Sequence, residues 1–460
     1  MRKKVKSKPV PVTEIMGELK RQIKMEEYIP RTFYRAYYKD TGRSRGNTLE
    51  SMLWYLVLQS LIGVVEDNIF LFLVRLCAEL RSFVGFGRVP DAGKISTFKQ
   101  VFAVEIGKVF DRFVEATEPI CRELDPQKAG YLVYDPTGVE ANVKENNPKY
   151  LNGKLTNARK VAAKNPEINA HALAYSQMPA FAGANPFAGQ QYINGHFCYA
   201  VKAGILANGL GVIRGISVFD DRFRQKHPEV VSRKTDDPQL DKEIADSTSL
   251  KPVLDDFFEA HPTFSYHTFL GDSSFDSYDT YPMLRDRFKF ERMCIPLNPR
   301  NSADAHRDFD QNGTPLCPLD NSKFRFLGPS KGKNRALRFK FVCHRSRPVT
   351  KSDCDCPTPC TDSPYGRCVY TYPDKNLRLY PGIPRGTDHW DNLYRHRVLI
   401  ERSIYILKYP LGAARRLTLS PRTIKADLFV AGIAHLVGLI LAFRTNKVDL
   451  FKSVRSLFSA

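Results

Sequence analysis

The sequence predicts a mixed α/β protein with a helical N-terminal domain and a β-rich insertion. Residues 48–86 are apolar with a helical period and contain few helix breakers. Short β-favouring runs begin at Tyr131, and two further helices end the chain. A stretch rich in Pro, Cys and Asn separates these strands from the last helices. We therefore expect four segments, at 1–125, 126–300, 301–390 and 391–460.

The charge balance favours a polyanionic partner. The 460 residues include 69 Lys and Arg against 49 Asp and Glu, which gives a net charge of +20. Nucleic acid is the first partner that such an excess indicates, and the alternative is a generally basic soluble protein. With 43% hydrophobic residues the chain can bury large cores, which excludes wholesale disorder.

Nothing in the sequence predicts a secreted or membrane protein. The basic N-terminus leads into no apolar run, so it is not a secretory signal. The longest apolar stretch, residues 428–443, is shorter than the roughly 18–20 residues of a membrane span and contains His435. We interpret it as a buried core helix and expect a cytoplasmic protein with no membrane partner.

The N-terminal segment leaves two functions open. Basic residues lie near aromatic ones at Arg31, Arg35 and Lys39. Residues 89–102 then supply a turn, an N-cap candidate and another helix. A helical module of this kind either binds DNA or serves packing and dimerisation.

The second segment places an aspartate after a buried strand. Residues 131–134 form a short apolar run that ends in Asp135, and α/β sheets commonly build sites at such strand ends. A looser stretch follows at about 145–192. Further strands are expected within 196–207, 211–220, 267–271 and 290–298, the third of them followed by Asp272. Asp220 and Asp221 also follow a strand, and we interpret them either as structural or as residues that support the catalytic acids from behind.

The insertion contains a basic, aromatic ribbon. Residues 323–351 hold ten Lys or Arg and no Asp or Glu. Phe324, Phe326, Phe339 and Phe341 alternate with Lys323, Arg325, Arg338 and Lys340 on either side of a Gly/Ser/Asn turn. Such alternation predicts a β-hairpin with one aromatic and one cationic face. The cationic face either contacts DNA phosphates or is a solvated edge kept from aggregating by its charge.

Cysteines cluster in the same insertion. Six of the ten lie between Cys317 and Cys368, and in a reducing compartment such clusters favour metal binding or free thiols over disulfides. The spacing is not the paired C-x-x-C of a zinc ribbon, so a structural Zn²⁺ and free thiols both stay open. The zinc candidates are Cys343, Cys354, Cys356, Cys360 and Cys368.

A glutamate stands among cations near the end of the chain. On a helix of about 100° per residue, Tyr394, Arg397, Glu401 and Lys408 fall within about 60° of one another, with Leu and Ile opposite. The plainest interpretation of such a face is a solvated amphipathic helix. Together with Asp135 and Asp272, however, Glu401 would complete a set of three carboxylates suited to hard divalent cations.

These residues resemble a known family. Tyr394, Arg397, Glu401 and Lys408 match at every position the Y-x2-R-x3-E-x6-K signature of bacterial insertion-sequence transposases of the DDE type. The segment DSSF from Asp272 resembles the second motif of that group, and YDPTG resembles its first-aspartate motif. Ser274 and Pro136 depart from the usual residues of these two motifs. The resemblance covers about residues 45–445.

The resemblance implies an RNase H-like catalytic core that acts on double-stranded DNA. Asp135, Asp272 and Glu401 would be the catalytic residues and would hold two Mg²⁺ or Mn²⁺ ions. Tyr394, Arg397 and Lys408 would contact DNA beside the cleavage site. Cleavage at element ends and strand transfer into target DNA then imply a homodimer on DNA, in a nucleoid-associated bacterial protein.

Two rival functions remain open. The first is an RNase H-like, metal-dependent nuclease that cuts DNA without strand transfer. The second is a catalytically inactive derivative that only binds DNA. All three carboxylates are present in the sequence, which argues against the second rival.

Overall fold

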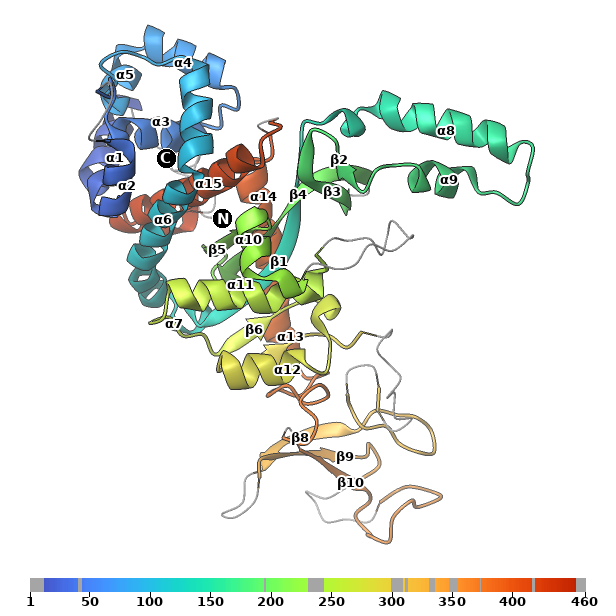
Figure 1. Cartoon of the computed structure of the whole chain (residues 1–460). Helices are drawn as coiled ribbons and strands as arrows, with labels where there is room; N and C mark the ends of the chain where they lie inside the picture. The colour runs from blue at the N-terminus through green and yellow to red at the C-terminus, as the bar shows by residue number, and fades with distance from the viewer. Residues whose placement is uncertain are drawn as a thin grey trace, which may run out of the picture. The chain divides into compact units, whose positions relative to one another are not determined.

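The chain forms a mixed α/β structure of helices and strands (Figure 1). It divides into two compact units. The computed structural model describes residues 12–39, 44–193, 196–230, 244–298, 309–310, 313–330, 336–346, 354–372, 374–415 and 418–451. Unit 1 comprises Met1–Pro126, Pro136–Pro262 and Ile400–Ala460, and unit 2 comprises Gln127–Asp135 and Thr263–Leu399. Each unit thus contains segments that lie far apart in the sequence. The division of the chain into four segments at residues 125, 300 and 390 stays a prediction.

Unit 1 begins with a block of helices whose ends depend on local sequence. Thr48 caps one helix by accepting from the backbone N–H of Ser51, and Gly63 ends it in the left-handed conformation. Asp91 is the N-cap expected within residues 89–102, because its side chain accepts from the N–H of Lys94. The helices are α1 (Val12–Gln22), α2 (Arg31–Tyr37), α3 (Leu49–Ile62), α4 (Asp67–Leu76), α5 (Ala78–Val84) and α6 (Ala92–Leu124).

The core of unit 1 is built around the C-terminal helix α15 (Pro421–Arg444), which packs against α6 and α3. This helix has the length and apolarity of a membrane span, but 94% of its most apolar window is buried inside the protein. That burial confirms the predicted core helix. Lys99 of α6 is buried beside Asp427 of α15 at 3.2 Å, so a charge pair lies within this apolar contact.

The remaining helices of unit 1 come after the first strand. Helix α11 packs against strand β4, and α15 and α6 pack against β5, so helices cover parts of the sheet. Helix α14 begins at Val398, two residues before the last segment of unit 1, which starts at Ile400. Their bounds are α8 (Pro148–Ala162), α9 (Ala170–Ser176), α10 (Asp221–Lys226), α11 (Asp246–Ala260) and α14 (Val398–Lys408).

The main sheet is mixed and has the strand order β2-β3-β4-β1-β6-β7, with β5 paired to β4. The pairs β2–β3, β3–β4 and β4–β5 are antiparallel, and β1–β6 and β6–β7 are parallel. The strands are β1 (Tyr131–Glu140), β2 (Phe181–Ala182), β3 (Asn185–Ile193), β4 (His196–Asn208), β5 (Ile213–Val218), β6 (Thr268–Leu270) and β7 (Arg292–Cys294). Each of the five predicted stretches, which begin at residues 131, 196, 211, 267 and 290, contains a strand, so these predictions are confirmed.

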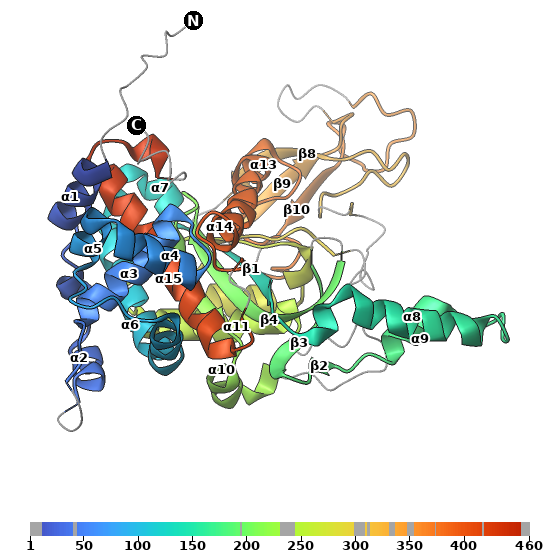
Figure 2. The same ribbon diagram turned by 90° about the horizontal axis from the view of Figure 1, so that it is seen from above.

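Two local expectations are wrong. Strand β1 does not end at Asp135 but continues to Glu140. Pro136 lacks an N–H, yet the chain stays extended beyond it, as a proline allows where no ladder bond is needed. The stretch at 145–192 is not loose, because α8 and α9 run side by side and project from β2 and β3 as an arm (Figures 1 and 2). Asn147 and Asn169 cap these two helices.

Unit 2 contains the insertion, whose strands form a separate three-stranded sheet in the order β10-β9-β8. The predicted hairpin is formed by β8 and β9, which pair antiparallel with a bulge after Phe326. Part of its turn, residues 331–335, lies outside the described residues, as do 347–353. The further elements of unit 2 are α7 (Pro126–Ala129), α12 (Thr280–Pro282), β8 (Arg325–Ser330), β9 (Arg338–Val342), β10 (Cys368–Thr371) and α13 (Asp388–Tyr394).

Candidate functional site

The two predicted catalytic aspartates lie close to the paired parts of two neighbouring parallel strands in unit 2, Asp135 on β1 and Asp272 just after the end of β6. Strand β1 pairs with β6 in a register that sets Val133 opposite Leu270. Asp135 and Asp272 each come two residues later along the chain. The β1–β6 register therefore brings both residues to the same end of this strand pair, with Asp135 inside its strand and Asp272 at the start of the turn that follows β6.

One guanidinium lies against both carboxylates. A single nitrogen of Arg397 lies 3.9 Å from Oδ2 of Asp135 and 3.6 Å from Oδ2 of Asp272. The two oxygens are therefore no farther apart than the sum of these distances. All three side chains are partly exposed, at 20% for Asp135, 35% for Asp272 and 21% for Arg397. Solvent, and hence a cation or a phosphate, can reach this acid pair.

Asp272 is held by its own turn. Its Oδ1 accepts from the backbone N–H of Ser274 at 2.8 Å and from the Ser274 hydroxyl. The short turn Ser273–Phe275 thus starts with an aspartate cap, which is the ordinary structural use of such a residue. The other oxygen is directed at Arg397, so the cap fixes the carboxylate without using the oxygen that faces the cation.

The second aspartate of DSSFD has a different role. Asp276 is buried and accepts from Arg378 through both carboxylate oxygens, at 3.0 and 2.7 Å. It also accepts from the hydroxyl of Tyr281 and the N–H of Asn298. A carboxylate this deeply bonded is structural, which separates Asp276 from Asp272.

The predicted helix carrying the glutamate is interrupted. Residues Arg395–Arg397 form a 3-10 turn between α13 and α14, so Tyr394 and Arg397 do not share one α-helix with Glu401. A 3-10 turn advances each residue by about 120° instead of about 100°, which shifts the predicted alignment. Tyr394 stacks on Trp390 at 6.2 Å within unit 2.

Glu401 and Lys408 belong to unit 1. Glu401 is exposed on α14, and whether it joins the two aspartates stays a prediction. Lys408 is buried, and its ammonium donates to the Thr137 hydroxyl on β1 at 2.8 Å. The expectation that Lys408 lies on an exposed face is therefore wrong, because a side chain at the end of α14 reaches inward to a strand.

Asp220, the first of the two acidic residues after β5, has a structural role. Asp220 caps α10 by accepting from the N–H of Phe223 at 3.3 Å. Its other oxygen pairs with Lys425 of α15 at 2.7 Å. These contacts hold α10 and α15 together within unit 1, and they account for Asp220 without a catalytic role.

The hairpin has the two predicted faces. Phe324, Phe339 and Phe341 are buried in a cluster with Cys317, Cys343 and Tyr380. On the other face, the Arg338 guanidinium lies 3.9 Å from the ring centre of Tyr370, which stands opposite Lys340.

The cations at the edge of the hairpin differ in their contacts. Arg325 is exposed and donates to the carbonyl of Ser346, whereas Lys323 pairs with Asp310 at 2.9 Å. Lys323 therefore carries less net positive potential than the other three cations of the hairpin.

The insertion brings some cysteines together. Burial raises the pKa of the Cys343 thiol, and the nearby thiols of Cys317 and Cys360 raise it further. In the described part of the chain, no three of the predicted zinc ligands come within 4.8 Å of one another. A zinc site in the insertion therefore stays a prediction. Cys317 was not among those candidates, although the same hairpin core holds it beside Cys343.

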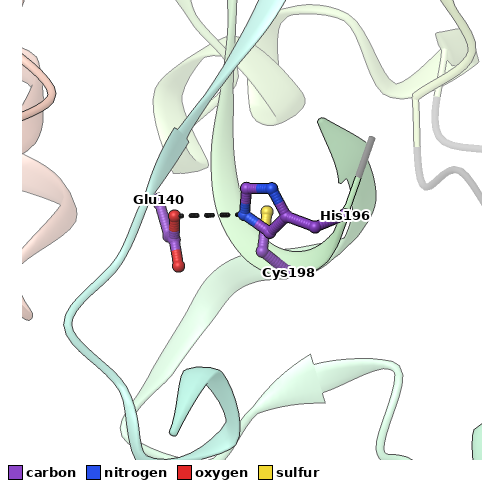
Figure 3. Close-up of side chains that lie close together, drawn as sticks. All are labelled: Glu140, His196 and Cys198. Atoms are coloured by element: carbon purple, nitrogen blue, oxygen red, sulfur yellow. Dashed lines mark ion pairs between the residues drawn. The ribbon is translucent and has the colours of Figure 1, made fainter. Parts of the chain in front are cut away.

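A different set of metal-type donors does meet within that distance. Glu140, His196 and Cys198 of unit 1 place one donor atom each within 4.8 Å of the others (Figure 3). Burial raises the pKa of Cys198 to about 12, with a contribution from the Glu140 carboxylate. No sequence motif signals this group, because its members come from two strands far apart in the chain.

The projecting arm adds a basic surface that sequence reasoning missed. Helix α8 carries four Lys or Arg and no Asp or Glu. Lys149, Arg159 and Lys160 are exposed. The sequence does contain a signal for this helix, an Asn-Pro start followed by basic residues without an acidic one. The Ala, Asn, Pro and Gly residues of the surrounding stretch are more typical of a loop and made this signal hard to recognise.

Comparison with known proteins adds no family. No protein-family model and no curated protein matches this chain. A functional conclusion therefore depends on the geometry of the site and on the resemblance of the sequence motifs.

Proposed function

We propose that this protein is a DNA transposase that cuts DNA at the ends of an insertion element and joins those ends to target DNA. The observation that carries the proposal is that Asp135 on β1 and Asp272 just after the parallel strand β6 both lie against Arg397. An RNase H-like core belongs to the same proposal. Glu401, from the matching signature, would be the third carboxylate.

The donor chemistry of the site fits two Mg²⁺ or Mn²⁺ ions. Carboxylate oxygens are the ligands that these hard cations prefer. In the metal-free protein the two aspartates face the positively charged guanidinium of Arg397 instead. When bound, the ions would activate the attacking oxygen and stabilise the leaving oxygen of the phosphodiester. The three acids would hold this centre, and Asp272 would do so with a carboxylate already fixed by its turn.

Arg397 would have two successive contacts. In the metal-free protein it neutralises the two aspartates. A guanidinium also matches phosphate geometry, so Arg397 would turn to the DNA backbone once divalent cations occupy the carboxylates. Tyr394 would position the DNA backbone or a displaced base beside it. Lys408 would hold β1 through Thr137 rather than act from an exposed face.

Two basic surfaces support double-stranded DNA as the partner. One is the outer face of the hairpin, with Arg325, Arg338 and Lys340. The other is the exposed side of α8. Phosphate contacts of this kind give salt-dependent affinity without reading sequence. Joining two element ends would require a homodimer on DNA, in the bacterial cytoplasm at the nucleoid.

The decisive experiment measures cleavage of duplex DNA taken from the flanks of the coding region, with Mg²⁺. We expect Asp135→Asn, Asp272→Asn and Glu401→Gln each to lower the cleavage rate by at least about a hundredfold, since each removes a ligand charge. Asp221→Asn, on an exposed residue of α10, is the matched control. Wild-type rates in any of the three variants would sink the assignment of that residue.

A second assay separates the transposase from its rivals. A pre-nicked element end supplies the 3′-hydroxyl, so strand transfer can be measured without cleavage. Joined products are expected from the transposase, whereas cutting without joining would indicate a nuclease. DNA binding that needs no metal, with no cleavage at any end sequence, would indicate the inactive derivative.

A further inference from the structure

Three side chains of different chemistry converge in unit 1, where β1 ends and β4 begins (Figure 3). Glu140 is the last residue of β1, which neighbours β4 in the sheet. His196 is the first residue of β4, and Cys198 follows two positions later. Because side chains alternate along a strand, His196 and Cys198 fall on the same face. The fold itself therefore brings the three side chains together.

Their separations suit ligands of one ion. Oε2 of Glu140 lies 3.5 Å from Nε2 of His196, and the Cys198 sulfur lies within 4.8 Å of both donor groups. Bonds of about 2.0 Å to nitrogen or oxygen and about 2.3 Å to sulfur put tetrahedral neighbours roughly 3.3–3.8 Å apart. The histidine–glutamate distance already has this value, and a small movement of the thiol would complete the set.

The donor types select the class of ion. Imidazole nitrogen, thiolate sulfur and carboxylate oxygen together are the ligands of Zn²⁺ and similar transition metals. Mg²⁺ and Ca²⁺ prefer oxygen alone. This group therefore differs in chemistry from the aspartate pair.

The exposure of the group allows an ion to enter from solvent. His196 is 54% exposed and Glu140 is 44% exposed, while Cys198 is buried beneath them. Lys408 is close enough to favour the ionised form of the Cys198 thiol. An ion bound here would keep a fourth position open to water.

We propose that Glu140, His196 and Cys198 bind one Zn²⁺-class ion that ties the end of β1 to the start of β4. The metal–sulfur bond forms as the thiol releases its proton to solvent, while imidazole and carboxylate each donate a lone pair. The alternative explanation of the group is an ion pair between Glu140 and His196. It would not account for the Cys198 sulfur beside them. The site lies five residues after Asp135 on the same strand, so it would steady the strand that carries this aspartate.

The test is a Co²⁺ titration of the metal-free full chain, because thiolate coordination gives cobalt a charge-transfer absorption. The insertion cysteines would contribute to that signal, so the background replaces all five zinc candidates, with Cys343→Ser, Cys354→Ser, Cys356→Ser, Cys360→Ser and Cys368→Ser. In this background we expect the charge-transfer absorption to saturate at one equivalent of thiolate-bound Co²⁺, which Zn²⁺ displaces. Adding His196→Ala or Glu140→Gln should weaken its binding at least about tenfold.

The controls keep folding separate from binding. His171→Ala changes an exposed histidine of α9 and should leave cobalt binding unchanged. Cys198→Ser should abolish the charge-transfer absorption, and its metal-free circular dichroism should match that of the parent. Equal cobalt affinity and stoichiometry in the parent, His196→Ala and Glu140→Gln would overturn the proposal. DNA cleavage is not the readout, so failure here is distinct from failure of the proposed function.

Discussion

Arg397 is the residue on which the acid pair depends. Its guanidinium lies against Asp135 and Asp272. A divalent ion bound to the same carboxylate oxygens would compete with it for this position. Like charges held close together are unfavourable without a cation between them. The arginine therefore offsets part of the repulsion between the two carboxylates in the metal-free protein.

Replacing this arginine should change metal binding and cleavage in opposite directions. In Arg397→Gln the divalent ion no longer competes with a guanidinium, so we expect Mn²⁺ affinity without DNA to rise about three- to tenfold. Cleavage should slow, because a phosphate contact is lost. Calorimetry measures the affinity, and Arg395→Gln on the exposed neighbour is the control. Weaker Mn²⁺ binding in Arg397→Gln would contradict this account.

The two aspartates of DSSFD should differ in their effect on stability. Asp276→Asn leaves the buried Arg378 without its charge partner, so we expect a loss of about 3–5 kcal/mol in the free energy of unfolding. Asp272→Asn keeps a good cap on its turn and should cost less than about 1 kcal/mol. Urea unfolding of both variants checks the difference. Similar losses in the two would show that Asp272 is also structural.

At the scale of elements, charge is gathered on two structures that lie outside the main sheet. The arm of α8 and α9 projects from β2 and β3 within unit 1 (Figure 2). The hairpin of unit 2 turns its aromatic side chains inward, which leaves its arginines and Lys340 on the other face. Both elements thus keep cations accessible to phosphates.

Neutralising the arm should weaken DNA binding in a salt-dependent way. For Lys149→Gln, Arg159→Gln and Lys160→Gln combined, we expect the slope of log Kd against log salt concentration to fall by about one unit for each lost phosphate contact. Fluorescence anisotropy with a labelled duplex measures the slope. Lys108→Gln with Arg112→Gln is the control, because each of these pairs with a glutamate on α6. An unchanged slope in the triple variant would exclude the arm from DNA contact.

At the scale of the whole molecule, the two units are each built from separated parts of the chain. Unit 1 needs its last segment, because α15 packs against α6 and α3 to form the core. Asp427 of α15 and Asp67 of α4 both pair with the buried Lys99, at 3.2 and 3.3 Å. The charge pair therefore connects elements more than 300 residues apart.

Removing one partner of this buried pair should destabilise the helical core. Asp427→Ala removes one of the two aspartates that pair with the buried ammonium of Lys99, and Asp67 stays. We therefore expect the free energy of unfolding to fall by about 3–5 kcal/mol. Thermal unfolding followed by circular dichroism measures it. Glu105→Ala breaks a more exposed pair on α6 and should change stability by less than about 1 kcal/mol. A loss no larger in Asp427→Ala than in this control would show that the pair does not stabilise the core.

Short-range sequence patterns were sufficient to predict the elements that depend on neighbouring residues. The helix cap within residues 89–102, the apolar helix near the C-terminus and the alternating hairpin all belong to this class, and the structure contains each of them. Propensity, capping and periodicity act over a few residues, so they can be recognised without knowledge of the fold.

Which distant residues meet could not be predicted in this way. The register of β1 on β6 brings Asp135 to Asp272, the 3-10 turn at Arg395–Arg397 breaks the predicted helical face, and Lys408 turns inward to Thr137. Long-range packing sets these contacts, because each depends on hydrogen bonds and burial that no local pattern encodes. The meeting of Glu140, His196 and Cys198 has the same origin, since the neighbouring places of two strands in the sheet bring these side chains together.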